Sequence, residues 1–211
     1  MCTNGRADGS PQPKITGLGG PGLTPGQVVT AVDEAITILR ILWVPGRSIS
    51  FTGEQYQLRD VQPGPSPAHS IGVWLGAAGP RMLDLLGRVA DGWIAPLSTP
   101  YETKPAAQER IDAAARAAGR SPGDIRRVIQ LVGTVTDHVR TSERPRTGPG
   151  SAPIRTTPDV WAQIIAAFVT EERFDTVNFV PATESPQQIA RFATEVVPAA
   201  REILAGLQPR A

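Results

Sequence analysis

Cysteine, histidine and lysine are scarce in this sequence of 211 residues, and their scarcity excludes several classes of site. Cys2 is the only cysteine, so the chain can form neither an intramolecular disulfide nor a multi-thiolate metal site. The two histidines, His69 and His138, have no second imidazole or carboxylate at the spacing of metal ligands. We therefore expect no metal site.

An excess of one charge is also lacking, because 21 basic and 20 acidic residues leave a formal net charge of +1. The basic residues are scattered and nearly all arginine, with Lys14 and Lys104 as the two lysines. Such a balance gives no field that attracts nucleic acid or an anionic membrane. No stretch approaches the roughly 20 apolar residues of a membrane span, and the N-terminus has no signal-peptide pattern. We expect a cytoplasmic protein without nucleic-acid or membrane partners.

What the sequence does contain is a hydroxyl residue followed by proline, repeated along the chain. Such a pair suits a helix start, because the hydroxyl caps the helix and proline takes its first position. The pairs begin at Thr24, Thr99, Ser121, Thr157 and Ser185. Three of them have Gln27, Glu102 or Gln188 three residues later, which predicts a capping box. Apolar residues at helical spacing follow four of the pairs, and a fifth helix is predicted from Pro80.

Short segments rich in β-branched and aromatic residues separate these helices. The predicted strands are residues 71–76, 92–96, 128–135 and 176–181, all nearly continuous in apolar character, as is typical of strands buried on both faces. Residues 48–51 and 55–58 predict a small hairpin, and residues 141–156 a long polar loop. The alternating order of strands and helices from residue 71 favours a parallel sheet in an α/β fold.

One turn in this pattern has candidate binding residues. The segment WLGAAGPRML, residues 74–83, joins an apolar strand to a helix through small residues. Its unobstructed N–H groups and the helix N-terminus favour phosphate binding, with a bidentate contact from an arginine. The alternative is that small residues let the helix pack closely on its strand. The candidate cofactor-binding residues are Gly76, Ala77, Ala78, Gly79 and Arg81. A dinucleotide-binding open sheet is the weaker interpretation, because the G-x-G-x-x-G spacing is missing.

Five longer segments of the sequence, one of which contains this turn, together resemble a known family. They are GGPGLTPGQVVTAVDEAITILRILW and ISFTGEQYQL (19–43 and 49–58), SIGVWLGAAGPRMLDLLGRVADGWIAP (70–96), and RFDTVNFVP with ESPQQIARFATEVVPAARE (173–181 and 184–202). In this order they resemble the luciferase-like monooxygenase family of flavin- or coenzyme F420-dependent oxidoreductases. The resemblance covers roughly residues 19–206 and implies a (β/α)8 TIM barrel.

The matched segments correspond to the C-terminal half of that barrel. The resemblance therefore implies an α/β fold that is a partial TIM barrel of about four β/α units, strands five to eight, with a small β-hairpin. We expect residues 1–18 to be a disordered N-terminal arm and residues 19–211 to be the half-barrel domain of a truncated protein. Open strand edges, and an apolar layer left partly exposed to water, predict a homodimer or an aggregation-prone chain. That layer is Val73, Leu75, Ile94, Val132 and Phe179.

The function that the resemblance implies is hydride transfer between reduced F420, or FMN, and an unknown small organic substrate. The family places the cofactor phosphate against the turn of residues 76–81, while most residues of its chemistry come from the N-terminal half, so no catalytic residue is assigned. F420 is preferred because the matching sequences are closest to that branch. The arginine-rich segment 140–155 either contacts the acidic polyglutamate tail of F420 or is a solvated loop. The alternative function is an inactive half-barrel remnant or an interaction module.

Overall fold

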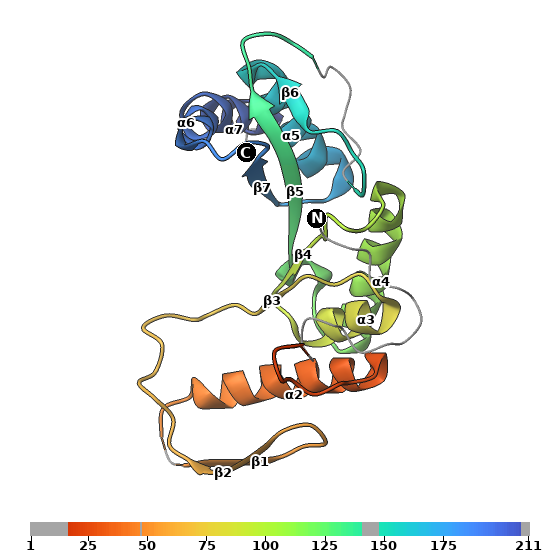
Figure 1. Ribbon diagram of the computed structural model, residues 1–211, viewed down its shortest axis with the longest axis vertical. Coiled ribbons are helices and arrows are strands. Elements are labelled where there is room, and N and C mark those ends of the chain that lie inside the picture. Colours follow the sequence, from red (N-terminus) through yellow and green to blue (C-terminus); the bar gives the residue numbers. More distant parts are fainter. Residues whose placement is uncertain (1–16, 47, 141–147, 208–211) are drawn as a thin grey trace. The chain divides into compact units, whose positions relative to one another are not determined.

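The computed structural model describes residues 17–46, 48–140 and 148–207 (Figure 1). The chain divides into two compact units, and the second begins at Gly72. The arm expected over residues 1–18 lies outside the described residues except for Gly17 and Leu18. None of the helices in the described part of the chain is long and apolar enough to cross a membrane.

The first unit consists of helix α2 (Pro25–Leu42) and a hairpin of β1 (Ile49–Thr52) and β2 (Gln57–Val61). The capping box predicted at Thr24 is confirmed. The Thr24 hydroxyl accepts the Gln27 N–H at 3.3 Å, and the Gln27 side chain accepts the Thr24 N–H at 2.9 Å. These bonds satisfy N–H groups that the first helical turn leaves without partners, so the helix begins at Pro25.

A carboxylate joins this helix to the hairpin. Glu34 accepts three successive backbone N–H groups, from Glu54 at 2.6 Å, Gln55 at 3.0 Å and Tyr56 at 2.9 Å. A Cβ on Gly53 would meet the Glu34 carboxyl group, so a larger residue there would displace this carboxylate. Glu34 therefore holds the hairpin turn against α2.

We predict that acid releases this turn. Burial by itself would raise the pKa of Glu34, but the three backbone hydrogen bonds outweigh burial and lower it from its ordinary value of 4.5. A lowered pKa in the folded state gives stability that is present above pH 4.5 and is lost as the pH falls through the folded value. Protection of the amides at residues 54–56, measured relative to their intrinsic exchange rates at the same pH, should fall as the pH drops through the folded pKa of Glu34. Glu34→Gln should show fast exchange already at pH 7, and equal protection in variant and wild type would contradict the prediction.

The second unit is built on a parallel sheet, which confirms the predicted α/β fold. Its strands are β3 (Trp74–Leu75), β4 (Gly92–Ile94), β5 (Arg126–Val135), β6 (Ile154–Thr156) and β7 (Thr176–Pro181). The Val128 carbonyl accepts the Ala95 N–H that follows β4, whereas the Gly133 carbonyl accepts the Ala182 N–H that follows β7. Because backbone groups alternate in direction along a strand, β4 and β6 share one edge of β5 and β7 takes the other.

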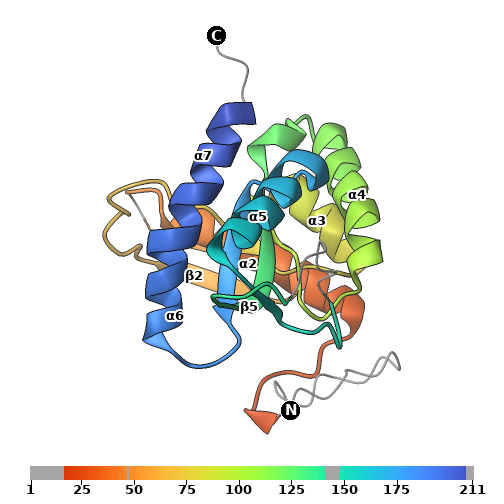
Figure 2. The same cartoon turned by 90° about the horizontal axis from the view of Figure 1, so that it is seen from above.

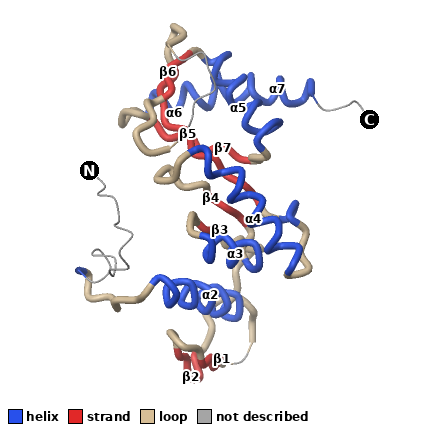
Figure 3. Tube along the Cα trace, turned by 90° about the vertical axis from the view of Figure 1, so that its right-hand side faces the viewer, coloured by secondary structure: helices blue, strands red, loops and turns tan. Residues whose placement is uncertain are grey.

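Helices connect and cover these strands. They are α3 (Pro80–Val89), α4 (Lys104–Ala117), α5 (Pro158–Glu172), α6 (Pro186–Arg191) and α7 (Val197–Leu207). Helices α3 and α4 lie side by side (Figure 3), and α5 packs against α7 (Figure 2). A π-helical segment, Phe192–Val196, joins α6 to α7, so the single helix predicted after Ser185 has an irregular middle.

Three local predictions are wrong. The polar loop expected over 141–156 ends in strand β6, while its residues 141–147 lie outside the described ones. The Thr99 hydroxyl donates to the Pro96 carbonyl and caps no helix, and α4 begins at Lys104 after a 3-10 turn. Gln188 forms no capping box. Its side-chain amide accepts the N–H of Val135 at 2.7 Å and donates to the carbonyl of Val135 at 3.2 Å, which extends the β7 edge beyond Pro181.

The two faces of β5 differ in burial, contrary to the expectation of strands buried on both faces. Ile129, Leu131 and Val135 are fully buried under the helices. On the other face Val128 is buried as well, at 4% exposed, whereas Gln130, Val132 and Thr134 are half-buried. The second set lies on what we call the open face, together with Ile94 and Trp74, which is 40% exposed.

The predicted apolar layer is therefore divided between the two faces. Ile94 and Val132 lie on the open face, whereas Phe179 pairs with buried Leu131 in register and stacks on Phe192 with ring centroids 4.1 Å apart. Val73 and Leu75 share the face of Phe179. All five side chains are half-buried, as predicted. The homodimer stays a prediction.

An ion cluster lies at the amino ends of the strands. Asp112 of α4 is 1% exposed, and its two carboxylate oxygens bind Arg127 of β5 and Arg173 at the end of α5. Burial lowers the pKa of Arg127, and attraction to Asp112 offsets this only in part. Removing one partner of a buried pair leaves the other charge without compensation, which is the costly case.

We predict that Asp112→Ala lowers the free energy of unfolding by about 3–5 kcal/mol. The matched control is Glu109→Ala, because Glu109 lies on the same helix and binds the same Arg173, but in an exposed pair at 2.6 Å. Exposed pairs contribute at most about 1 kcal/mol. Denaturant unfolding measures the loss in free energy of unfolding for each variant. Equal losses for the two variants would show that burial of the carboxylate does not determine how much its removal destabilises the protein.

Candidate functional site

The turn after β3 lies at the carboxyl ends of the parallel strands, where sheets of this class bind ligands. Gly79 caps α3 in an extended conformation (φ −76°, ψ 147°), and Pro80 takes the first helical position. The buried Trp93 indole donates to the Ala77 carbonyl at 2.9 Å, which holds the turn against β4. The N–H groups of Ala78, Gly79 and Arg81 donate to none of the described residues. They are free to bind an anion.

The glycines of the turn are not required by packing. Neither Gly76 nor Gly79 has a positive φ. A Cβ on Gly79 would meet nothing within 4 Å, and one on Gly76 would lie 3.9 Å from the Ile94 carbonyl. By contrast, a Cβ on Gly87 would lie 2.5 Å from the Ile111 carbonyl, where α3 crosses α4. Close helix packing therefore explains Gly87 but does not explain the turn glycines.

We predict that Gly79→Ala lowers the free energy of unfolding by no more than about 1 kcal/mol, because the added methyl group meets no neighbour and the remaining cost is that alanine caps α3 less well than glycine. Gly87→Ala should cost about 1–3 kcal/mol, because the added methyl group overpacks the contact between α3 and α4. Thermal and denaturant unfolding of the two purified variants checks both values. A Gly79→Ala variant as unstable as Gly87→Ala would restore the packing explanation of the turn.

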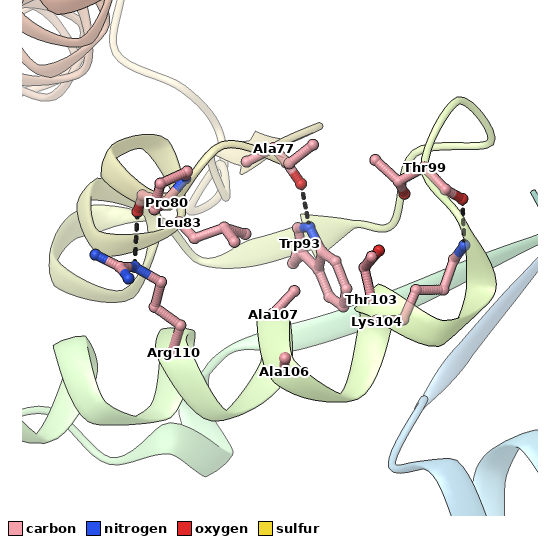
Figure 4. A pocket seen from close by; sticks show the side chains of 11 residues that line it. Ala77, Pro80, Leu83, Trp93, Thr99, Thr103, Lys104, Ala106, Ala107 and Arg110 are labelled. Carbon is pink, nitrogen blue, oxygen red and sulfur yellow. Dashed lines mark hydrogen bonds between the residues drawn. The ribbon is translucent and has the colours of Figure 1, made fainter.

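A pocket of about 280 Å³ adjoins the turn (Figure 4). Ala77, Ala78 and Pro80 of the turn form one wall. The rest consists of the apolar side chains Leu83, Trp93, Ala106 and Ala107, the hydroxyl residues Thr99 and Thr103, and the cationic residues Lys104 and Arg110.

The two cations of the pocket are differently placed. Lys104 is 2% exposed, and its ammonium donates to the Thr99 carbonyl at 3.0 Å. Burial lowers the pKa of Lys104, while Glu102 and Glu172 oppose this change. Arg110 is half-exposed, donates from Nε to the Pro80 carbonyl at 3.0 Å and pairs with Asp84 at 2.6 Å. Its hydrogen bond to Asp84 raises the pKa of Arg110.

Only some of the candidate residues line the pocket. Ala77 and Ala78 line the pocket, Gly76 and Gly79 lie in the same turn, and the exposed Arg81 is not among the residues that line the pocket. Sequence reasoning missed Lys104 and Arg110 as site residues. Lys104 was a possible signal, as one of two lysines, but only the fold shows that it borders the turn. Within the described ranges, no three His, Cys, Asp or Glu side chains gather as metal ligands do.

Comparison with known proteins now adds to this geometry. A family model described as luciferase-like monooxygenase matches residues 5–147. The chain is 36% identical over 104 residues to an F420-dependent hydroxymycolic acid dehydrogenase of Mycobacterium tuberculosis, covering 49% of this chain and 28% of that protein. It is 33% identical over 100 residues to a 5,10-methylenetetrahydromethanopterin reductase of Archaeoglobus fulgidus, covering 47% and 29%.

Solved structures resemble the fold over a longer stretch. A riboflavin lyase, solved with modified FMN and riboflavin, matches 92% of this chain and 62% of its own, with a TM-score of 0.75 and 13% identity. An F420-dependent secondary alcohol dehydrogenase, solved with an F420-acetone adduct, matches 90% and 66%, with a TM-score of 0.68 and 14% identity. The matches span less than a third of these curated relatives and less than two thirds of these solved chains.

Proposed function

Because the chain belongs to the luciferase-like monooxygenase family, we propose that it binds coenzyme F420 and positions it for hydride transfer with a small organic substrate. F420 is named in several of the relatives that the chain resembles in sequence. FMN is the alternative cofactor. When bound, the cofactor supplies the hydride chemistry, and the protein binds and orients it.

The observation that carries the proposal is the turn of residues 76–81. The N–H groups of Ala78, Gly79 and Arg81 make no bond to the described residues, and packing does not require the turn glycines. The N-terminus of α3 adds about half a positive charge. A phosphate group would accept these N–H groups, and the exposed Arg81 side chain adds a possible bidentate contact.

The open face offers the surface for the rest of the cofactor. Ile94 and Val132 are half-buried there, and Trp74 is 40% exposed. Apolar and aromatic side chains favour a flat ring system. The side chains of this face therefore bind and orient, and no residue of the chain is assigned an acid or base role.

We predict that Gly79→Val raises the Kd of F420 at least about tenfold, because a branched side chain fills the space of the phosphate and removes about 1.4 kcal/mol or more of binding. The quenching of F420 fluorescence on titration measures the Kd. Gly64→Val is the matched control, since an added Cβ there also meets nothing within 4 Å. An unchanged Kd in Gly79→Val would remove the turn from the site. If neither F420 nor FMN bound the wild-type chain, the alternative of a non-catalytic interaction module would gain.

A further inference from the structure

We propose that the pocket between α3 and α4 receives the acidic polyglutamate tail of F420, and that this pocket selects F420 over FMN. The inference rests on the proposed function, because it assumes that the phosphate lies on the turn of residues 76–81. FMN ends at its phosphate, whereas F420 continues from its phosphate into a chain of carboxylates. A pocket that adjoins the turn on its helix-covered side would therefore contact the tail of F420, whereas FMN has no group that reaches it.

Strand alternation places the pocket on that side. Trp93 points to the helix-covered face and lines the pocket, while its neighbour Ile94 lies on the open face. The turn contributes to the pocket wall through Ala77, Ala78 and Pro80. A ligand whose ring lies on the open face and whose phosphate lies on the turn would thus continue directly into the pocket.

The charges of the pocket suit a chain of carboxylates better than a single anion. Lys104 and Arg110 are six residues apart on α4, which is about 9 Å along the helix axis. Figure 4 shows them at opposite ends of the pocket with Trp93 between them. Arg110 uses its Nε and one Nη2 donor in the described structure, which leaves three of its five N–H donors for a ligand.

The apolar part of the wall suits the methylene groups that separate these carboxylates. Leu83, Trp93 and Ala107 form this part, between the two cations. The apolar wall can contact the methylene groups of the tail, while the cations on either side of it contact the carboxylates. Neighbouring carboxylates limit the attraction, because Asp84 pairs with Arg110 and both Glu102 and Glu172 act electrostatically on Lys104. We therefore expect a modest gain in affinity rather than tight anchoring.

The test compares F420 bearing several glutamates with F420 whose tail has been removed, by fluorescence titration of the wild-type chain. The tailed form should bind about tenfold more tightly, the gain of one charge-assisted hydrogen bond. This difference should shrink as salt rises, because exposed charges are screened. FMN should bind no more tightly than tail-less F420. Equal Kd values for the two F420 forms would overturn the inference and leave the proposed function intact, whereas absence of binding by either form would overturn both.

The variant Arg110→Met tests whether the affinity gained from the tail comes from the pocket. It should bring the Kd of tailed F420 close to that of the tail-less form measured with the same variant, so that the ratio of the two Kd values falls toward one. Arg116→Met is the matched control, because Arg116 lies on the same helix, also pairs with an aspartate, and does not line the pocket. Loss of affinity in Arg116→Met, or equal loss for both F420 forms in Arg110→Met, would overturn the inference.

Discussion

From Ile129 to Val135 the side chains of β5 alternate between a face that helices bury and a face that stays half-buried, and the site depends on this alternation. Ile129, Leu131 and Val135 belong to the buried apolar core on which the helices of the second unit pack. The neighbouring strand follows the same alternation in register, so Trp93 is buried beside α4 while Ile94 remains on the open face. The two halves of the candidate site are therefore two sides of one sheet.

The turn after β3 connects these two sides. The pairing of β3 with β4 and a buried hydrogen bond from the Trp93 indole to the Ala77 carbonyl hold it in position. Trp93 thus has three roles: it fills the core, orients the turn and lines the pocket. The two glycines of the turn, Gly76 and Gly79, are not required by any close neighbour, whereas Ala77 is buried in the core. Gly64 is equally unconstrained, so the distinction of the turn glycines is their place beside N–H groups that have no partner among the described residues at the start of α3, where a ligand can approach the backbone closely.

Local patterns predicted much of the secondary structure, because they act within one or two turns of chain. The capping box at Thr24, the hairpin and the helix from Pro80 follow from neighbouring residues and were correctly predicted. The same reasoning failed at Thr99 and Gln188, where a distant part of the chain competes for the side chain. Gln188 binds the backbone of Val135, a partner 53 positions away that no local pattern reveals.

The sequence by itself determined the order of strands and helices, the α/β class and the small-residue turn, since each depends on residue type at short spacing. Only the tertiary structure decided which face of each strand is covered, because helix packing, and not the apolar character of a strand, determines burial. It also brought Lys104 and Arg110 beside a turn more than 20 positions earlier. Proximity of that kind comes from the crossing of α3 and α4 at Gly87, a contact between elements that have no sequence pattern in common.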